Sequence, residues 1–144
     1  MKVIIVSGVP GTGKTTLAKK LSKEKNLKYI DVNALIKKNK LANGFDRRLH
    51  SKIVDVKKLN KLLIGIIKKS KKDLIIDSHL AHYLPKRYVT LCIVTKTSIS
   101  KLRNRLKKRR YSKVKIEENV DAQNFDICFI EAKELGHKIK VIIT

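Results

Sequence analysis

Short runs of apolar, mostly β-branched residues recur along the chain and alternate with longer segments of helical periodicity. The runs lie at residues 2–6, 27–30, 73–77, 88–94 and 138–143. Continuous apolar runs of this length are typical of strands that are buried on both faces of a sheet. Because helical material separates each run from the next, the pattern predicts an α/β fold, with five strands in a parallel sheet and helices on both faces.

One helix and one insertion follow from the spacing. The segment 55–71 opens with an aspartate suited to an N-cap and carries apolar residues at helical spacing, namely Val56, Leu59, Leu62, Leu63, Ile66 and Ile67. Residues 33–40 predict a short helix, but residues 41–46 are turn-like and no period is sustained up to residue 54. We therefore expect residues 31–54 to form a small insertion outside the sheet.

The segment before the last predicted strand has an interrupted helical pattern. Residues 97–109 place Ile99, Leu102 and Leu106 on one face, and residues 116–135 resume as a second predicted helix. Between them, a cluster of arginine and lysine leads into a break at Tyr111-Ser112. An arginine-rich break between two helices predicts a lid.

Residues 8–16 read Gly-Val-Pro-Gly-Thr-Gly-Lys-Thr-Thr and directly follow the first predicted strand. A glycine-rich turn between a strand and a helix aims consecutive backbone N–H groups at one point, where the phosphates of a nucleoside triphosphate bind. In this context the segment predicts the phosphate-binding loop of a P-loop NTPase. The residues expected at the phosphates are Gly11, Thr12, Gly13, Lys14, Thr15 and Thr16.

These loop residues have different expected roles. Lys14 is predicted to bridge the β- and γ-phosphates, the Thr15 hydroxyl to enter the shell of a Mg²⁺ ion, and Thr16 to contact the α-phosphate. Gly11 and Gly13 lack side chains because the backbone must approach the phosphates closely.

Two polar residues follow the third predicted strand. Asp77 lies at its carboxyl end, where ligands gather in an open α/β sheet, and it is the candidate carboxylate beside the metal. His79 lies two residues further on and points to the same side of an extended chain. Two interpretations of His79 stay open. In the first, it orients a water molecule or the transferring phosphoryl group; in the second, it is a loop histidine held by structural hydrogen bonds.

Arginine in the predicted lid supplies the last catalytic candidates. Arg105 and Arg109 are four residues apart and therefore lie on one helical face. Phosphoryl transfer spreads negative charge over the equatorial oxygens, and guanidinium groups stabilise that charge by two-point contacts. We interpret Arg103, Arg110 and most of the lysines as solvated surface charges.

The chain is strongly basic. Its 35 Lys and Arg face 12 Asp and Glu, which gives a formal net charge of +23, and 42% hydrophobic residues in 144 support a single globular domain. The charge indicates either nucleic acid or a ribonucleoprotein as a partner, or a lysine-rich or heat-adapted proteome. Both interpretations stay open, since the excess is spread along the whole chain.

The remaining residues of interest predict no further site. Cys92 and Cys128 stand in apolar surroundings without metal-ligand spacing and are interpreted as buried free thiols. His50, His82 and His137 have no partner at metal-ligand spacing, and we expect them to face solvent. No apolar run approaches the length of a membrane span and no signal peptide is evident, so we expect a cytosolic, cytoplasmic protein without membrane contact.

Together, these motifs resemble the adenylate kinase isoenzyme 6 family over nearly the whole chain. The phosphate loop is shared with many nucleotide enzymes, whereas an Asp-x-His element with a later proline, joined to an Arg-Leu-x-x-Arg-x-Tyr lid, is much more specific. The segments that carry the resemblance are Gly8 to Thr16, Asp77-Ser78-His79 with Pro85, Leu102-x-x-Arg105-Leu106-x-x-Arg109-x-Tyr111, Glu118-Asn119 and Glu131-Ala132.

The resemblance implies a nucleoside monophosphate kinase core with a monophosphate-binding insertion at about residues 31–54 and a lid at about residues 108–118. It implies the conversion of ATP and AMP to two ADP, with slower ATP hydrolysis, and Mg²⁺ as the metal. Arg109 would contact ATP, and His79 would serve the hydrolytic step. It also implies a role in small ribosomal subunit maturation, with a ribosomal protein of the platform, and rRNA, as partners.

Two departures from the family pattern stand out, and three functions stay open. Arg110 replaces a usual lid glycine, and Gln123 stands where glutamate is expected. The first function is an adenylate kinase, the second is an ATPase assembly factor that uses ATP to bind and leave a ribonucleoprotein, and the third is a kinase of another small acceptor such as a different nucleoside monophosphate or shikimate. The insertion would decide the acceptor.

Overall fold

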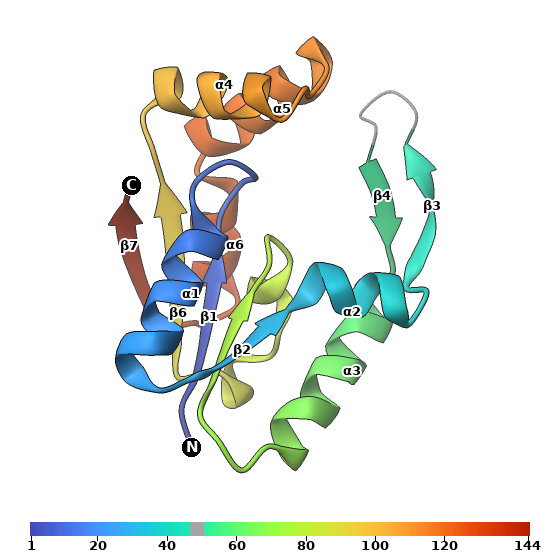
Figure 1. Ribbon diagram of the computed structural model, residues 1–144, viewed down its shortest axis with the longest axis vertical. Helices are drawn as coiled ribbons and strands as arrows, with labels where there is room; N and C mark the ends of the chain where they lie inside the picture. Colours follow the sequence, from blue (N-terminus) through green and yellow to red (C-terminus); the bar gives the residue numbers. More distant parts are fainter. Residues whose placement is uncertain (47–50) are drawn as a thin grey trace.

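The computed structural model describes residues 1–46 and 51–144 and confirms the predicted sheet. The sheet has five parallel strands, and the β1 strand lies in the middle (Figure 1). Their order across the sheet is β2 (Lys28–Asp31), β5 (Leu74–Asp77), β1 (Val3–Ser7), β6 (Leu91–Lys96) and β7 (Ile139–Ile143).

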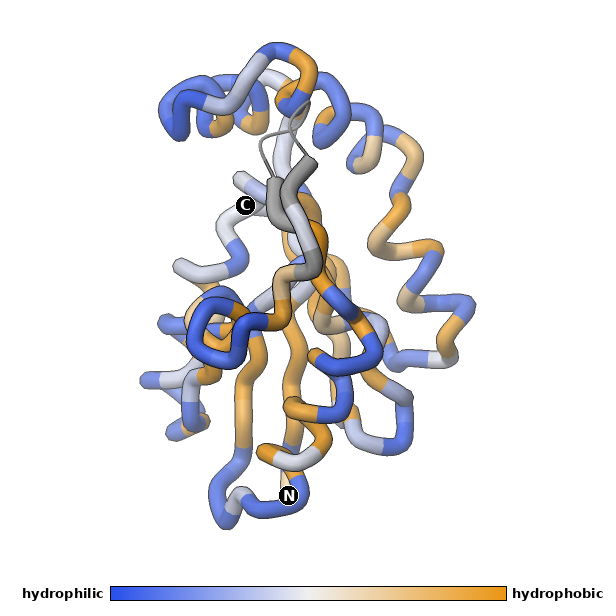
Figure 2. The backbone as a smooth tube through the Cα atoms, turned by 90° about the vertical axis from the view of Figure 1, so that its right-hand side faces the viewer, coloured by the Kyte–Doolittle hydropathy of each residue, from blue (hydrophilic) through white to orange (hydrophobic). Residues whose placement is uncertain are grey.

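Helices cover both faces of the sheet, as predicted. On one face, α1 (Lys14–Lys25) packs Ala18 against alternate residues of the central strands. The other face buries the remaining strand residues beneath α2 (Val32–Lys38), α3 (Val56–Lys69) and α6 (Ile127–Glu134). Figure 2 shows the strands as hydrophobic stretches inside the molecule. Both faces being apolar explains why the strand sequences show continuous apolar runs without alternation.

The strand register brings three segments of chain to one edge of the sheet. Val6 of β1 lies beside Asp77 of β5, and Ser7 lies beside Val94 of β6. Because all strands are parallel, the loops that leave these carboxyl ends start close together. The phosphate loop, the segment after Asp77 and the segment after β6 therefore meet at this edge.

The insertion contains a β-hairpin, and the prediction of a turn-like segment at residues 41–46 was wrong. β3 (Ala42–Asp46) pairs antiparallel with β4 (Ser51–Val54), with an irregularity between Ala42 and Gly44. Figure 1 shows this hairpin standing apart from the main sheet. Strand pairing uses backbone N–H and C=O groups, which almost every residue carries, so this hairpin left no recognisable period in the sequence. His50 lies outside the described residues.

The helical region before β7 divides twice instead of once. α4 (Ile99–Lys108) and α5 (Lys113–Asn124) form a separate apolar cluster above the phosphate loop, with Ser98 and Ser112 as N-caps. The single helix predicted at 116–135 was wrong, because Asp126 adopts a left-handed conformation with φ 54° and pairs with Lys96. The apolar pattern continues through this break, which hid it in the sequence.

The short segment after β5 also differs from its prediction. The last-but-one predicted strand begins at Leu91 rather than at Tyr88, because two short 3₁₀ helices, Ala81–Tyr83 and Lys86–Tyr88, precede it. Cys92 is buried, as expected, and Cys128 is only half-buried; neither is in a disulfide. No helix within the described residues is long and apolar enough to cross a membrane.

The lid break contains a strained residue that makes a prediction. Arg110 has φ 59°, in the left-handed region where a Cβ atom is unfavourable. Replacing it by glycine, Arg110→Gly, should raise the free energy of unfolding by up to about 1 kcal/mol in urea titrations, because glycine relieves the strain at some entropic cost.

The matched control places the same change within a helix. Lys61 is exposed in α3, where Lys61→Gly should lower the free energy of unfolding by about 1 kcal/mol. Equal destabilisation by both substitutions would contradict the strain at Arg110.

Candidate active site

A cleft of about 610 Å³ opens at the carboxyl edge of the sheet. That volume suits a small organic ligand. Four segments line it: the phosphate loop, the end of β5, the insertion and the lid. The lining residues that matter below are Gly11, Gly13, Lys14, Thr15, Thr16, Asn33, Ile36, Asp77, His79, Arg109 and Tyr111.

The loop needs glycine at positions that no other residue can occupy. Gly8 has φ 142°, and a Cβ atom there would lie 2.5 Å from Thr95 Oγ1. Gly13 has φ 83° and is the N-cap of α1. The first turn of α1 thus begins directly at the cleft, where the free N–H groups and the helix dipole favour an anion.

Lys14 stands half-buried at the start of α1. Its Nζ donates to the Val9 carbonyl at 3.1 Å. Burial lowers the Lys14 pKa to about 8, against the opposing effect of the Asp77 carboxylate. Without a bound anion, this ammonium group is therefore held in an environment that disfavours its charge.

Asp77 accepts two hydrogen bonds on one oxygen. The Thr15 hydroxyl donates to Oδ2 at 2.6 Å, and the Tyr29 hydroxyl donates to the same atom at 2.9 Å. A hydroxyl and a carboxylate side by side are the hard oxygen donors that Mg²⁺ takes in small number, so Thr15 and Asp77 suit that ion. Sequence reasoning missed Tyr29, because its strand lies beside β5 only in the folded chain.

His79 reaches the cleft beside Asp77, as the spacing suggested. Its side chain is accessible from the cleft. Desolvation by the surrounding protein atoms, together with the positive charge of Lys14, lowers the pKa of His79 below the ordinary histidine value. The imidazole is therefore neutral near pH 7, where one ring nitrogen can accept a hydrogen bond.

The structure separates the two lid arginines. Arg109 caps α4 and lines the cleft, near enough to Lys14 to lower the lysine pKa. Arg105 does not line the cleft; its Nη1 donates to the Gly11 carbonyl at 3.1 Å and to Thr144 Oγ1 at 3.0 Å. Although both arginines lie on one helical face, Arg109 faces the cleft and Arg105 contacts the backbone of the phosphate loop.

Several side chains hold the phosphate loop from outside the cleft. Thr144 Oγ1 donates to the Thr12 carbonyl at 3.0 Å, and Thr12 Oγ1 donates to the Val9 carbonyl at 2.7 Å. Thr12 and Thr95 also share a hydrogen bond at 2.6 Å between their hydroxyls. Thr12 is fully buried and absent from the cleft lining, so its side chain faces the sheet.

Gln123 explains one departure from the family pattern. Its Nε2 donates to the Thr97 carbonyl at 2.7 Å, and its Oε1 accepts from the Thr97 N–H at 3.1 Å. Only an amide can both donate and accept in this way, because a glutamate at neutral pH has no donor. The glutamine therefore fastens α5 to the end of β6.

Two histidines expected to face solvent are buried, and that prediction was wrong. His82 Nδ1 shares a hydrogen bond with Ser7 Oγ at 2.7 Å, and His137 Nε2 lies 2.8 Å from the His82 carbonyl. Burial lowers the pKa of His82, while nearby Glu131 raises it. Spacing along the chain cannot show either pairing, because the partners lie 75 and 55 residues apart in the sequence.

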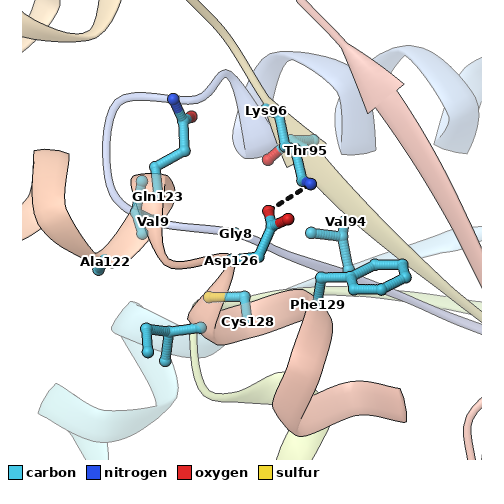
Figure 3. Close-up of a pocket in the computed structure, with 11 residues that line it drawn as sticks. Gly8, Val9, Val94, Thr95, Lys96, Ala122, Gln123, Asp126, Cys128 and Phe129 are labelled. Atoms are coloured by element: carbon cyan, nitrogen blue, oxygen red, sulfur yellow. Dashed lines mark ion pairs between the residues drawn. The ribbon is translucent and has the colours of Figure 1, made fainter. Parts of the chain in front are cut away.

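A small cavity of about 10 Å³ lies behind the loop. Gly8, Gln123 and Cys128 are among the residues around it, and the ion pair of Lys96 with Asp126 spans it (Figure 3). It is too small for an organic ligand. The wide cleft is therefore the candidate site.

Comparison with known proteins agrees with this architecture. A family model described as an AAA domain matches residues 4–126. The adenylate kinase isoenzyme 6 homolog of Schizosaccharomyces pombe is 39% identical over 131 residues, covering 91% of this chain and 74% of the relative. That of Dictyostelium discoideum is 30% identical over 140 residues, covering 97% and 78%. The chain belongs to the adenylate kinase isoenzyme 6 family.

Solved structures confirm the fold of this adenylate kinase isoenzyme 6 family member. Shikimate kinase from Acinetobacter baumannii, in complex with shikimate, aligns with a TM-score of 0.66 at 13% identity, over 97% of this chain and 83% of that one. At such low identity the likeness concerns the fold alone. It is the three-layer α/β/α fold of P-loop kinases.

The lowered pKa of Lys14 makes a prediction for this adenylate kinase isoenzyme 6 family member. Phosphate binding needs the charged ammonium group, and the free protein loses that charge as the pH rises through about 8. ATP affinity, measured by calorimetry without metal, should be constant between pH 7 and 7.5. It should then fall by up to roughly tenfold per pH unit above 8.

The Lys14→Met variant is the control, since it has no titrating group at this position. Its ATP affinity should be weak and nearly independent of pH over the same interval. The same slope in this variant would show that another group is responsible.

Proposed function

We propose that the chain is a Mg²⁺-dependent adenylate kinase, which converts ATP and AMP to two ADP. The observation that carries the proposal is the meeting, in one cleft, of the phosphate loop, Asp77 with Thr15, and the lid residue Arg109, opposite the insertion. The names of the relatives support AMP as the acceptor.

In this reaction, the bond between the γ-phosphorus and the β,γ-bridging oxygen of ATP breaks, and a bond to a phosphate oxygen of AMP forms. Lys14 would bridge the β- and γ-phosphates. Their negative charge would stabilise the ammonium form of Lys14, which burial disfavours. Arg109 would contact the transferring group from the lid. When bound, Mg²⁺ neutralises part of the phosphate charge, and Thr15 and Asp77 would hold it.

The remaining loop residues would contribute by position. Gly11, Gly13 and Thr16 line the cleft around the N-terminus of α1, where their N–H groups would bind the phosphates. Thr12 would act through its backbone, since its side chain is buried. Catalysis of this kind depends on alignment and fixed charges rather than covalent chemistry. Arg105 would act at a distance, by holding Gly11.

Two segments that line the cleft support a monophosphate-binding insertion and a lid. We assign monophosphate binding to the insertion at about residues 31–54, where Asn33 and Ile36 of α2 line the cleft opposite the phosphate loop. We assign the lid to about residues 108–118, which comprise the end of α4, the break after it and the first half of α5. Closure of both over the nucleotides would exclude water from the transferring phosphoryl group.

Slower hydrolysis of ATP belongs to the same proposal. Neutral His79 stands beside Asp77 in the cleft and could accept a hydrogen bond from a water molecule at the γ-phosphate. This role needs no acceptor nucleotide. Hydrolysis without AMP should therefore depend on His79 more than transfer to AMP does.

A test of both activities follows ADP formation from ATP with and without AMP. AMP should accelerate ADP formation at least tenfold, and Lys14→Ala should lower both activities by at least a hundredfold, because it removes the charge at the β- and γ-phosphates. His79→Ala should lower hydrolysis without AMP about tenfold or more. If AMP does not accelerate ADP formation, the kinase assignment fails.

The second candidate function is that of an ATPase that acts on the small ribosomal subunit, in the cytoplasm. The net charge of +23 supports a polyanionic partner, which would include rRNA beside a platform protein. The two free thiols suit a reducing compartment. This function would use the same cleft, with water as the acceptor.

The partner is tested by co-purification with small-subunit particles at rising salt concentration. A specific complex should persist at salt concentrations that release a lysine-rich control protein of equal net charge, because nonspecific contacts with phosphates weaken steeply with salt. Release of both proteins at the same salt concentration would leave only nonspecific attraction.

A further inference from the structure

We propose that Tyr29 is a positioning residue for the magnesium site: its hydroxyl holds one oxygen of Asp77 and thereby presents the other oxygen to the metal and its water shell. This inference rests on the proposed function, since it assumes that the cleft binds ATP with Mg²⁺. It adds a residue that no loop or strand motif contains.

The geometry at the carboxylate is asymmetric. Both donors, Tyr29 at 2.9 Å and Thr15 at 2.6 Å, bond to Oδ2. No described residue donates a hydrogen bond to Oδ1. Asp77 itself is 8% exposed, so its carboxylate has little freedom to seek other partners. Oδ1 is thus the oxygen left for a ligand.

The sheet explains how Tyr29 reaches this position. Tyr29 in β2 lies opposite Ile75 in β5, two residues before Asp77, so Ile75 and Asp77 point to the same face of the sheet. Tyr29 packs with Ile75 in the apolar cluster beneath α1, the helix that also carries Thr15 near its start. The long phenol side chain spans the remaining distance along the strand.

The ring is held independently of its hydroxyl. Leu17 and Leu21 of α1 belong to the same cluster as Tyr29, and the Lys19 ammonium lies 5.8 Å from the ring centroid. Removing the hydroxyl alone therefore leaves the packing of the ring in place. The substitution Tyr29→Phe isolates the hydrogen bond to Asp77.

The physical role of the bond is to restrict rotation of the carboxylate. The terminal torsion of an aspartate is broad and nearly two-fold, so one donor leaves its plane loosely defined. Two donors on one oxygen narrow that freedom. Partners of this kind commonly change metal affinity or activity by 10–100-fold when they are removed.

Two binding measurements separate this role from a purely structural one. The affinity of ATP is measured by calorimetry in excess Mg²⁺ and again in EDTA, for the wild type and Tyr29→Phe. The substitution should weaken binding about tenfold with Mg²⁺ and leave binding in EDTA unchanged, because only the first depends on the orientation of Asp77. It should also raise the Mg²⁺ concentration needed for half-maximal binding of ATP.

The matched control is Tyr88→Phe, which removes a hydroxyl from another half-buried tyrosine, whose oxygen accepts from Arg87 outside the cleft lining. It should change neither affinity. An equal loss with Mg²⁺ and with EDTA in Tyr29→Phe would indicate a structural role and overturn the proposal, as would unchanged affinity in both.

A double substitution adds an independent test. In Asp77→Asn, the Tyr29 hydroxyl no longer acts on a carboxylate, so adding Tyr29→Phe should cause little further loss of affinity with Mg²⁺. Additive losses would overturn the proposal. These measurements use no AMP, so the test of Tyr29 remains valid even if AMP fails to accelerate ADP formation. A wild type that does not bind ATP would instead overturn the proposed function itself.

Discussion

The phosphate loop can offer its N–H groups to a ligand only if its carbonyl groups are held elsewhere. In a planar trans peptide, the carbonyl oxygen and the following N–H point in opposite directions. Arg105 donates a hydrogen bond to the Gly11 carbonyl, and Thr144 donates one to the Thr12 carbonyl. Each of these hydrogen bonds fixes the orientation of one peptide group, so that the N–H of the following residue points away from the side chain that donates to the carbonyl. The rest of the site is built around a loop whose backbone is fixed in this way.

The donors that hold the loop come from the end of the chain and from the helix that precedes the lid. Thr144 follows β7, and Arg105 belongs to α4. Gln123 of α5 grips Thr97, whose hydroxyl in turn donates to the Thr144 carbonyl at 3.0 Å. Both helices around the lid are therefore connected by hydrogen bonds to the loop. The break between them contains Arg110 in its left-handed conformation.

The charge distribution explains why the cleft suits an anion. Burial lowers the pKa of Lys14 to about 8, and positive neighbours help to keep His79 neutral. The Asp77 carboxylate opposes these cations, but its Oδ2 is already shared by two hydroxyl donors. A polyphosphate with Mg²⁺ would satisfy both sides at once, the cations by its oxygens and the carboxylate by the metal.

The sequence by itself determined the sheet strands, the cap of α3 and the loop, because each depends on neighbours along the chain. Apolar runs mark strands buried on both faces, Asp55 caps α3 as expected, and the glycines of the loop mark positive φ angles. Only the tertiary structure decided what distant residues do. It turned Arg105 away from the cleft, brought Tyr29 to Asp77, buried His82 against Ser7 and formed a hairpin where no period was visible. These outcomes depend on strand order and on which side chain meets a free donor or acceptor, and a local pattern contains neither.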